Sequence, residues 1–250
     1  SAPSTRMGNV AGYRSAWIAA ADYLKKSEAA KGGQGEAPTR DLQLETLAGV
    51  LTGDILVHNH CYRADEMSVM LEIAQEFGYK VTAFHHAVEA YKIADLLREN
   101  GTCAAIWADW YGFKMEAFDG IRENAAILDQ ADACTVMHSD DDIGIQRLNQ
   151  ESAKVIGAAA KAGIDIPPER AIRWFTANAA KALGIADHVG TLEVGKMADV
   201  TVWNRNPFSV YAQAQQVYID GALAYDRSNA ATNPVTDFTL GTSAQHGGTE

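Results

Sequence analysis

Residues 80–109 read KVTAFHHAVEAYKIADLLRENGTCAAIWAD, and this stretch decides the fold class. A short apolar run over 80–86 leads into a helical pattern over 89–101, and a second apolar run over 102–109 follows. Short buried runs that alternate with helices of this length are typical of parallel βα units. The sequence therefore predicts an α/β protein with a parallel sheet.

Further units of the same kind flank this stretch. Before it, the apolar run 54–58 precedes a helical pattern over 64–78. After it, a helical pattern over 118–132 leads to the run 133–140, and another helix is expected over 145–162. Four strands, each followed by a helix, make either half of an eightfold barrel or a complete small doubly wound sheet.

The segments outside these units have a different character. Apolar residues at helical spacing predict helices over 10–26 and 41–53, and a further helix with prolines near its start over 167–185. Beyond it, β-type runs with turn glycines predict a small β-subdomain. We divide the chain into a βα part (residues 1–185), a β-subdomain (186–228) and a polar C-terminal tail (229–250).

Composition excludes several classes of protein. The 250 residues are 47% hydrophobic and 21% charged, which is ordinary for a globular chain with a sizeable core. The formal charge is −11 and Lys and Arg do not cluster, so we expect no nucleic-acid partner. No apolar stretch reaches the roughly 18 residues that span a bilayer. We expect a soluble protein without membrane contact, in the cytoplasm or the periplasm.

The cysteines give no sign of a disulfide framework. Cys61, Cys103 and Cys134 are odd in number and widely spaced, and each lies in or just after an apolar run. No CxxC pair occurs that would indicate a zinc site. We therefore expect buried free thiols.

Chemically capable side chains fall where the predicted strands end. They are His58 and His60, then His85 and His86, then Asp109, then His138 and Asp140. Both parallel architectures place active sites at this edge of the sheet. Three of the four runs end in histidine although the chain has seven histidines in all, so we predict a functional site there.

Imidazole and carboxylate groups are good ligands for Zn²⁺ and similar ions. His58, His86 and Asp140, each from a different strand, could converge on one ion, and Asp140 could also exchange a proton with a bound water. His58 and His60 share a face if both lie on a strand. His85 and His86 then point to opposite faces, so at most one of them reaches the site and the other is structural.

Simpler interpretations remain open at this point. The acidic run at 139–142 could be a solvated turn, and His188 and His246 are expected at the surface. The chain has no GxSxG, no GxxxxGK[ST] and no GxGxxG, so nucleophilic serine chemistry and nucleotide binding find no support.

Four stretches together resemble the second half of a metal-dependent amidohydrolase. They are HNHCYRADE (58–66), HHAVEAYKIADLL (85–97), MHSDDD (137–142) and GTLEVGKMADVTVW (190–203). The resemblance covers residues 50–226 and is strongest to the imidazolonepropionase-like and prolidase-like branch. It implies strands five to eight of a (β/α)8 TIM-type barrel, strands of a small β-sandwich, and one or two divalent metal ions, with Zn²⁺ the first choice.

The resemblance also implies roles for individual residues. His58, His86 and Asp140 would end strands five, six and eight as metal ligands, and Asp140 would be the catalytic proton shuttle. His60 would contact substrate or replace His58 as the ligand. His86 is favoured over His85 because the family has its histidine before a small residue and a TEAYK-like stretch.

The family's remaining ligands have no counterpart here. Its HxH on strand one and its bridging lysine or glutamate on strand four would precede residue 1. We therefore expect the N-terminal half of the enzyme to be a separate or cleaved chain that joins this one, and we expect a homo-oligomer.

The function expected from these residues is hydrolysis of an amide or cyclic amide C–N bond in a small molecule by metal-activated water, as in a dipeptidase or an imidazolonepropionase-like enzyme. Alternatives are a deaminase of the same superfamily, a non-catalytic binding or scaffold subunit with half of the barrel, or a four-stranded doubly wound binding domain.

Several residues are candidates for substrate contact. They are His60, Arg63, Tyr91 and Asp109. Arg63 could hold a substrate carboxylate through a bidentate contact, although a surface arginine fits equally well. Trp107, Trp110 and Tyr111 could wall a pocket or simply pack in the core.

Overall fold

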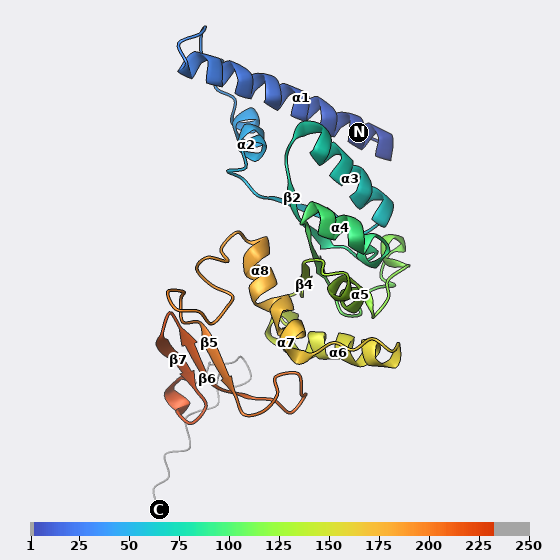
Figure 1. Cartoon of the computed structure of the whole chain (residues 1–250), viewed down its shortest axis with the longest axis vertical. Helices are drawn as coiled ribbons and strands as arrows, with labels where there is room; N and C mark the ends of the chain where they lie inside the picture. Colours follow the sequence, from blue (N-terminus) through green and yellow to red (C-terminus); the bar gives the residue numbers. More distant parts are fainter. Residues whose placement is uncertain (1–2, 233–250) are drawn as a thin grey trace, which may run out of the picture.

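The computed structural model describes residues 3–232. A central parallel sheet with its helices lies between an N-terminal pair of helices and a C-terminal antiparallel sheet (Figure 1). The predicted tail from residue 233 onward, with His246, lies outside the described residues.

The helices are α1 (Arg6–Lys31), α2 (Leu42–Leu51), α3 (Ala64–Phe77), α4 (Ala94–Asn100), α5 (Asn124–Gln130), α6 (Leu148–Lys161), α7 (Pro168–Ala171) and α8 (Ala177–Ala182). Short 3-10 turns are η1 (Ala90–Ile93), η2 (Met115–Ala117), η3 (Gly144–Arg147), η4 (Ile172–Phe175) and η5 (Ala230–Thr232). The strands are β1 (Val57–Cys61), β2 (Val81–His86), β3 (Cys103–Ile106), β4 (Thr135–Met137), β5 (Val200–Trp203), β6 (Ala214–Ile219) and β7 (Ala222–Asp226).

The first four strands form one sheet in the order β1-β2-β3-β4, and every pairing is parallel. The predicted α/β fold with a parallel sheet is therefore confirmed. That these are strands five to eight of an eightfold barrel stays a prediction. Strands β2 and β3 follow the preceding helices closely because a glycine ends each helix: Gly78 after α3 and Gly101 after α4 both have left-handed backbone, which glycine adopts without strain.

The helices that follow the four strands pack on one face of the parallel sheet. Side chains on that face of the sheet form the main core with side chains from the helix after each strand. The sheet contributes Phe84, Ile106 and Met137, and helices α3, α4, α5 and α6 contribute Leu71, Leu97, Leu128 and Val155, respectively. A doubly wound sheet has connecting helices on both faces. The helices that connect successive strands here pack on one face, and α8, which packs on the other, connects no two strands of this sheet. This arrangement of the connecting helices favours the barrel-type arrangement over the doubly wound alternative.

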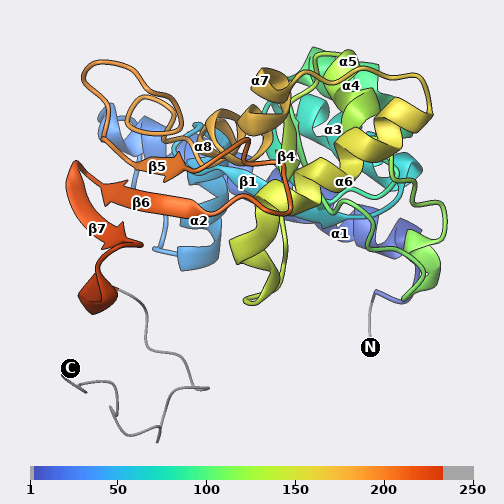
Figure 2. The same cartoon turned by 90° about the horizontal axis from the view of Figure 1, so that it is seen from below.

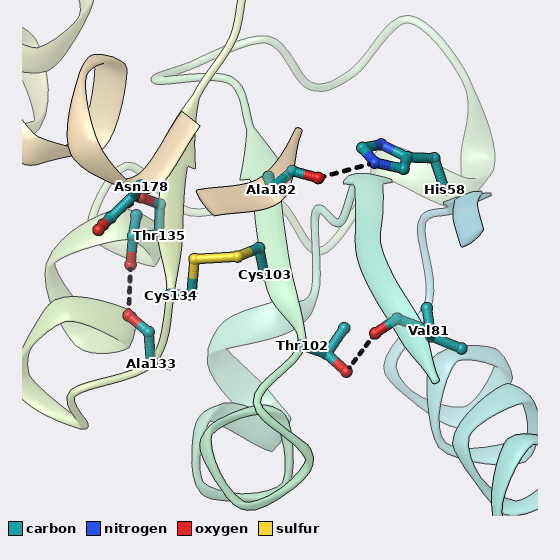
Figure 3. The surroundings of a disulfide bond; sticks show 9 residues. All are labelled: His58, Val81, Thr102, Cys103, Ala133, Cys134, Thr135, Asn178 and Ala182. Carbon is teal, nitrogen blue, oxygen red and sulfur yellow. Dashed lines mark hydrogen bonds between the residues drawn. A yellow bond between two sulfur atoms is a disulfide. The ribbon is translucent and has the colours of Figure 1, made fainter. Parts of the chain in front are cut away.

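The opposite face is lined by small side chains and by α8. Ala83, Cys103, Ala105 and Val136 form a second core cluster with Ala182 of α8. Figure 3 shows α8 lying across these strands. Asn178 of α8 donates a hydrogen bond from Nδ2 to the carbonyl oxygen of Thr135, at 2.8 Å. Small residues on both surfaces allow a helix to pack closely against a sheet.

The expectation of three free cysteines is wrong for two of them. Cys103 and Cys134 form a disulfide, with Cα atoms 4.4 Å apart (Figure 3). The register of β3 and β4, in which Ala104 lies opposite Thr135, places these two residues side by side. A register between strands that are 31 residues apart is not visible in cysteine spacing. Cys61 is a buried free thiol as expected, and burial raises its pKa to about 12.

The ends of the described chain flank this central part. On the N-terminal side, α1 packs on α3 through ion pairs of Arg6 with Glu66 and of Arg14 with Glu76. On the C-terminal side, β5, β6 and β7 form an antiparallel sheet (Figure 2). Within residues 3–232, no helix has both the length and the apolar character that crossing a bilayer requires.

Candidate functional site

Five of the seven histidines gather on the parallel sheet. They are His58 and His60 on β1, His85 and His86 on β2, and His138 just after β4. Nδ1 of His58 lies 2.8 Å from Nε2 of His85, and Nδ1 of His60 lies 2.7 Å from Nε2 of His86. The ring of His138 lies 6.0 Å from that of His85 and 5.4 Å from that of His86, centroid to centroid. The structure thus brings histidines from three strands together.

His86 has a backbone conformation that changes where its side chain points. Its φ is +70°, and that of Ala87 is +24°. Residues other than glycine rarely adopt positive φ, and they do so at a cost of about 1–3 kcal/mol. The turn lets His86 reach β1 beside His85. The expectation that only one of these two adjacent histidines could face the site is therefore wrong, because strict alternation ends at the last residue of the strand.

Asn124 secures the strained turn. Its Nδ2 donates to the carbonyl oxygens of Ala87 and Val88, at 3.1 and 3.0 Å, and its Oδ1 accepts from the backbone N–H of Tyr91, at 3.0 Å. The side chain is buried, with 4% of the residue exposed. Sequence analysis missed Asn124 because an asparagine at the start of a helix is ordinary.

Asp140 lies next to His86. Its Oδ2 is 3.8 Å from Nδ1 of His86, and its backbone also has positive φ, at +52°. The neighbouring Asp141 has a local role, because its side chain accepts from the backbone N–H of Gly144 at the start of η3. The acidic run is therefore not uniform: Asp140 is turned to the histidines and Asp141 caps a turn.

Burial favours the neutral form of His85, His86 and His138. Desolvation, with smaller contributions from neighbouring histidines, lowers the pKa of His138 to about 3 and that of His85 to about 4. Desolvation also lowers the pKa of His86, against the opposing effect of the Asp140 carboxylate. A neutral imidazole retains a lone pair, and this is the form that binds a metal ion.

Two ring nitrogens are buried without a partner. Among the described residues, Nδ1 of His86 and Nε2 of His138 form no hydrogen bond. Buried polar atoms are rarely left in this state, and these two, with the Asp140 carboxylate nearby, fit a divalent metal ion. The arrangement is not a finished site, because within residues 3–232 no three His, Cys, Asp or Glu side chains are placed to hold an ion together.

The two histidines of β1 differ in their surroundings. Both ring nitrogens of His58 have partners, since Nε2 lies 3.0 Å from the carbonyl oxygen of Ala182 in α8 (Figure 3) and Nδ1 pairs with His85. His60 is exposed and pairs with His86. The structure therefore brings His60 rather than His58 to His86 and, through it, to Asp140.

The other predicted substrate residues have partners of their own. Arg63 forms a bidentate pair with Asp65, at 3.0 and 3.2 Å. Asp109 pairs with Lys154 at 2.7 Å. The hydroxyl of Tyr91 donates to the carbonyl oxygen of Asp119 at 3.0 Å. Within the described residues, none of the three has a hydrogen bond or ion pair with the clustered histidines, so their contact with substrate stays a prediction.

An aromatic wall stands beside the histidines, formed by Tyr62, Trp107 and Phe113. The Tyr62 ring stacks on His86 at 5.0 Å, and the Trp107 ring stacks on His86 at 4.6 Å. Trp107 is fixed by a hydrogen bond from Nε1 to the carbonyl oxygen of Ser139, at 3.0 Å. Phe113 lies 5.7 Å from Trp107. Sequence analysis named Trp107 but missed Tyr62 and Phe113, which lie in loops with no periodic pattern.

Comparisons with known proteins agree with this geometry. The model of the amidohydrolase family matches residues 122–224. An amidohydrolase from Thermotoga maritima superimposes with a TM-score of 0.79 and 30% identity, over 90% of this chain and 57% of that one. Residues 122–224 thus match the amidohydrolase family in sequence, and the fold of the chain resembles that of an amidohydrolase.

Two curated amidohydrolase relatives match over different extents. Amidohydrolase tasK of Hapsidospora irregularis is 28% identical over 244 residues, which is 93% of this chain and 24% of the relative. Imidazolonepropionase of Shewanella halifaxensis is 59% identical over 39 residues, 16% of this chain and 10% of that enzyme. This chain thus spans about a quarter of tasK and just over half of the Thermotoga protein.

A zinc-bound adenosine deaminase from Xanthomonas campestris has a fold similar to that of this chain. The TM-score is 0.55 at 20% identity, over 75% of this chain and 49% of that one.

Proposed function

We propose that this chain supplies part of the active site of a metal-dependent hydrolase that cleaves an amide or cyclic amide C–N bond in a small molecule. The observation that carries the proposal is the cluster at the sheet edge, where His86, in a strained conformation, lies between His60 and Asp140. The similarity to amidohydrolases in sequence and fold supports the same chemistry.

The residues proposed to hold the metal are His86, Asp140 and one histidine of β1. The sequence favours His58 for the third position, whereas the contacts favour His60, because both ring nitrogens of His58 already have partners. Zn²⁺ is the first candidate, since neutral imidazoles and a carboxylate suit it. A bound divalent ion would supply a water whose pKa is lowered toward 7.

Asp140 is proposed as the catalytic proton shuttle. Its carboxylate lies at the rim, with the side chain 55% exposed, so it can reach both a water and a leaving group. A carboxylate in that position takes a proton from the attacking water and returns it to the departing nitrogen. His138 and the aromatic wall exclude water from the buried side of the site.

The experiment compares two neighbouring carboxylates after the protein is loaded with Zn²⁺. Hydrolysis of a panel of dipeptides and N-acyl amino acids is measured for Asp140→Asn and for the control Asp142→Asn, which changes an exposed residue of the same run. We expect Asp140→Asn to lose about 100-fold or more in kcat and the control to stay near the wild type. Equal activity of all three proteins would refute the proposal.

Metal content decides the third ligand. The Zn²⁺ content of each variant is measured by elemental mass spectrometry. If the contacts indicate the ligand correctly, His60→Ala should lose Zn²⁺ and His58→Ala should retain it. The reverse result would return His58 to the ligand set. Loss of metal in neither variant would refute a β1 ligand altogether.

The proposal includes a complementary part of the enzyme. Within the described residues, β1 and β4 are the edge strands of the sheet, and unpaired parallel edges invite further strands. We propose that further strands of the barrel pair with these edges, and that the assembly is a homo-oligomer. Native mass spectrometry of the purified material measures both.

A further inference from the structure

Lys114 lies at the aromatic wall and is unlike the other cations near the site. Its Nζ is 3.8 Å from the centroid of the Tyr62 ring and 5.5 Å from that of Phe113. Such cation–π contacts hold an ammonium in place without neutralising its charge. Among the described residues, no carboxylate lies within ion-pair distance of Lys114.

The neighbouring cations are already neutralised. Arg63, the residue that sequence analysis considered for a carboxylate, is held by Asp65 through two contacts. Lys92 pairs with Asp119 at 2.6 Å and with Glu89 at 3.4 Å. Unlike Arg63 and Lys92, Lys114 therefore remains available for a ligand within the described part of the chain.

The Tyr62 ring links Lys114 to the histidines. The Tyr62 ring stacks on the imidazole of His86 at 5.0 Å, and the ammonium group of Lys114 lies over the same Tyr62 ring. An anion bound to Lys114 would thus lie one aromatic ring away from the reacting centre. Trp107 and Phe113 extend the apolar surface next to it, and 57% of Phe113 is exposed and free to meet a ligand.

We propose that Lys114 binds the carboxylate of the substrate while Tyr62, Trp107 and Phe113 pack against an aromatic or other apolar group of the same molecule. The substrate class is an amide of an apolar amino acid with a free carboxylate. This inference rests on the proposed amide hydrolysis at the same site, because it names the class of amide that the site accepts.

The first test measures binding of two probes that differ in one charge. N-acetyl-L-phenylalanine carries the carboxylate, and N-acetyl-L-phenylalanine amide replaces it by a neutral group. Their dissociation constants are measured by calorimetry for the full chain loaded with Zn²⁺, as the wild type, Lys114→Met, Lys114→Arg and the control Lys80→Met. Lys80 lies before β2, at the opposite end of that strand from His86.

We expect Lys114→Met to weaken binding of the acid by about tenfold, the size of a lost charge-assisted contact, and to leave binding of the amide unchanged. Lys114→Arg should retain the preference for the acid, and Lys80→Met should behave as the wild type. The inference is overturned if Lys114→Met leaves the ratio of acid to amide affinity unchanged, or if the wild type binds the acid no better than the amide.

The second test concerns the apolar group. Phe113→Ala should weaken binding of N-acetyl-L-phenylalanine by about three- to tenfold, as loss of an aromatic contact does, and should leave N-acetylglycine unaffected. Phe118→Ala is the matched control, because Phe118 is 73% exposed in the same loop and has no contact with the aromatic wall. Equal losses for both probes or both variants would overturn the role of the wall.

These outcomes are separate from failure of the proposed function. If binding depends on Lys114 but the loaded protein releases no acetate or phenylalanine, the recognition site stands and hydrolysis fails. If hydrolysis proceeds but the acid and amide bind alike in every variant, hydrolysis stands and the recognition site fails.

Discussion

Replacing Asn124 by alanine removes the side chain that holds the turn behind His86. Three hydrogen bonds are lost, to the carbonyl oxygens of Ala87 and Val88 and from the N–H of Tyr91. Each contributes about 1 kcal/mol in a folded protein. Ala87 and Val88 are 0% and 5% exposed, so water does not readily replace the lost donors. We expect the free energy of unfolding to fall by about 3 kcal/mol, and by more if the carbonyls stay unpaired.

The assay is urea unfolding of the metal-free protein followed by tryptophan fluorescence. Asn100→Ala is the matched control, because Asn100 donates to Leu96 within α4 and meets Gln75 at the surface, at 3.3 Å. We expect the control to lose less than about 1 kcal/mol. A loss for Asn124→Ala no larger than that of the control would refute the reasoning.

A second readout separates support of the turn from general stability. If Asn124 holds His86 in its left-handed conformation, Asn124→Ala should also release Zn²⁺ more readily to a chelator at temperatures where it remains folded. Asn100→Ala should retain the ion as the wild type does. Unchanged chelator competition in folded Asn124→Ala would contradict the link between the turn and the metal ligand.

Two further predictions concern the stability of the sheet. Reduction of the Cys103–Cys134 disulfide, or Cys103→Ser with Cys134→Ser, should lower the free energy of unfolding by about 2–4 kcal/mol. Reductant should not change the stability of a protein that already carries both substitutions. If reductant has no effect on the stability of the wild type, the disulfide is contradicted. Acidification should destabilise the metal-free protein, because burial lowers the pKa of His138 to about 3 and of His85 to about 4 from an ordinary 6.5. Below pH 6.5 the unfolded chain takes up protons that the folded chain does not, so unfolding becomes easier as the pH falls toward 4. The melting temperature should therefore be lower at pH 5 than at pH 7.5, and an equal or higher value at pH 5 would be inconsistent with neutral buried imidazoles.

The elements of the sheet could be predicted from the sequence because their signal is local. Apolar runs ending near His86 and His138 alternate with helical patterns, and that periodicity needs no knowledge of distant contacts. The same local logic predicts a functional site at the strand ends. The resemblance to amidohydrolases, rather than spacing, names His86 and Asp140 as metal ligands; the structure places them 3.8 Å apart, and their role stays a prediction.

The remaining features depend on contacts that the sequence does not encode locally. The disulfide follows from the register of β3 against β4, which packing sets. The reach of His86 follows from its positive φ, which tertiary contacts impose on a residue that does not favour it. Lys114 and Phe113 lie in a loop without periodicity, and their position beside Tyr62 arises only when the strands are side by side.

The close packing of α8 on the small-residue face limits how this protein can diversify. Ala83 and Ala105 are 0% and 3% exposed beneath the helix, so a bulkier side chain at either position would lift α8 and move the Ala182 carbonyl away from His58. Related sequences should therefore vary little on this face of the sheet. Their variation should accumulate in the loops after the strands, above all at residues 109–116, whose side chains are half-buried or exposed.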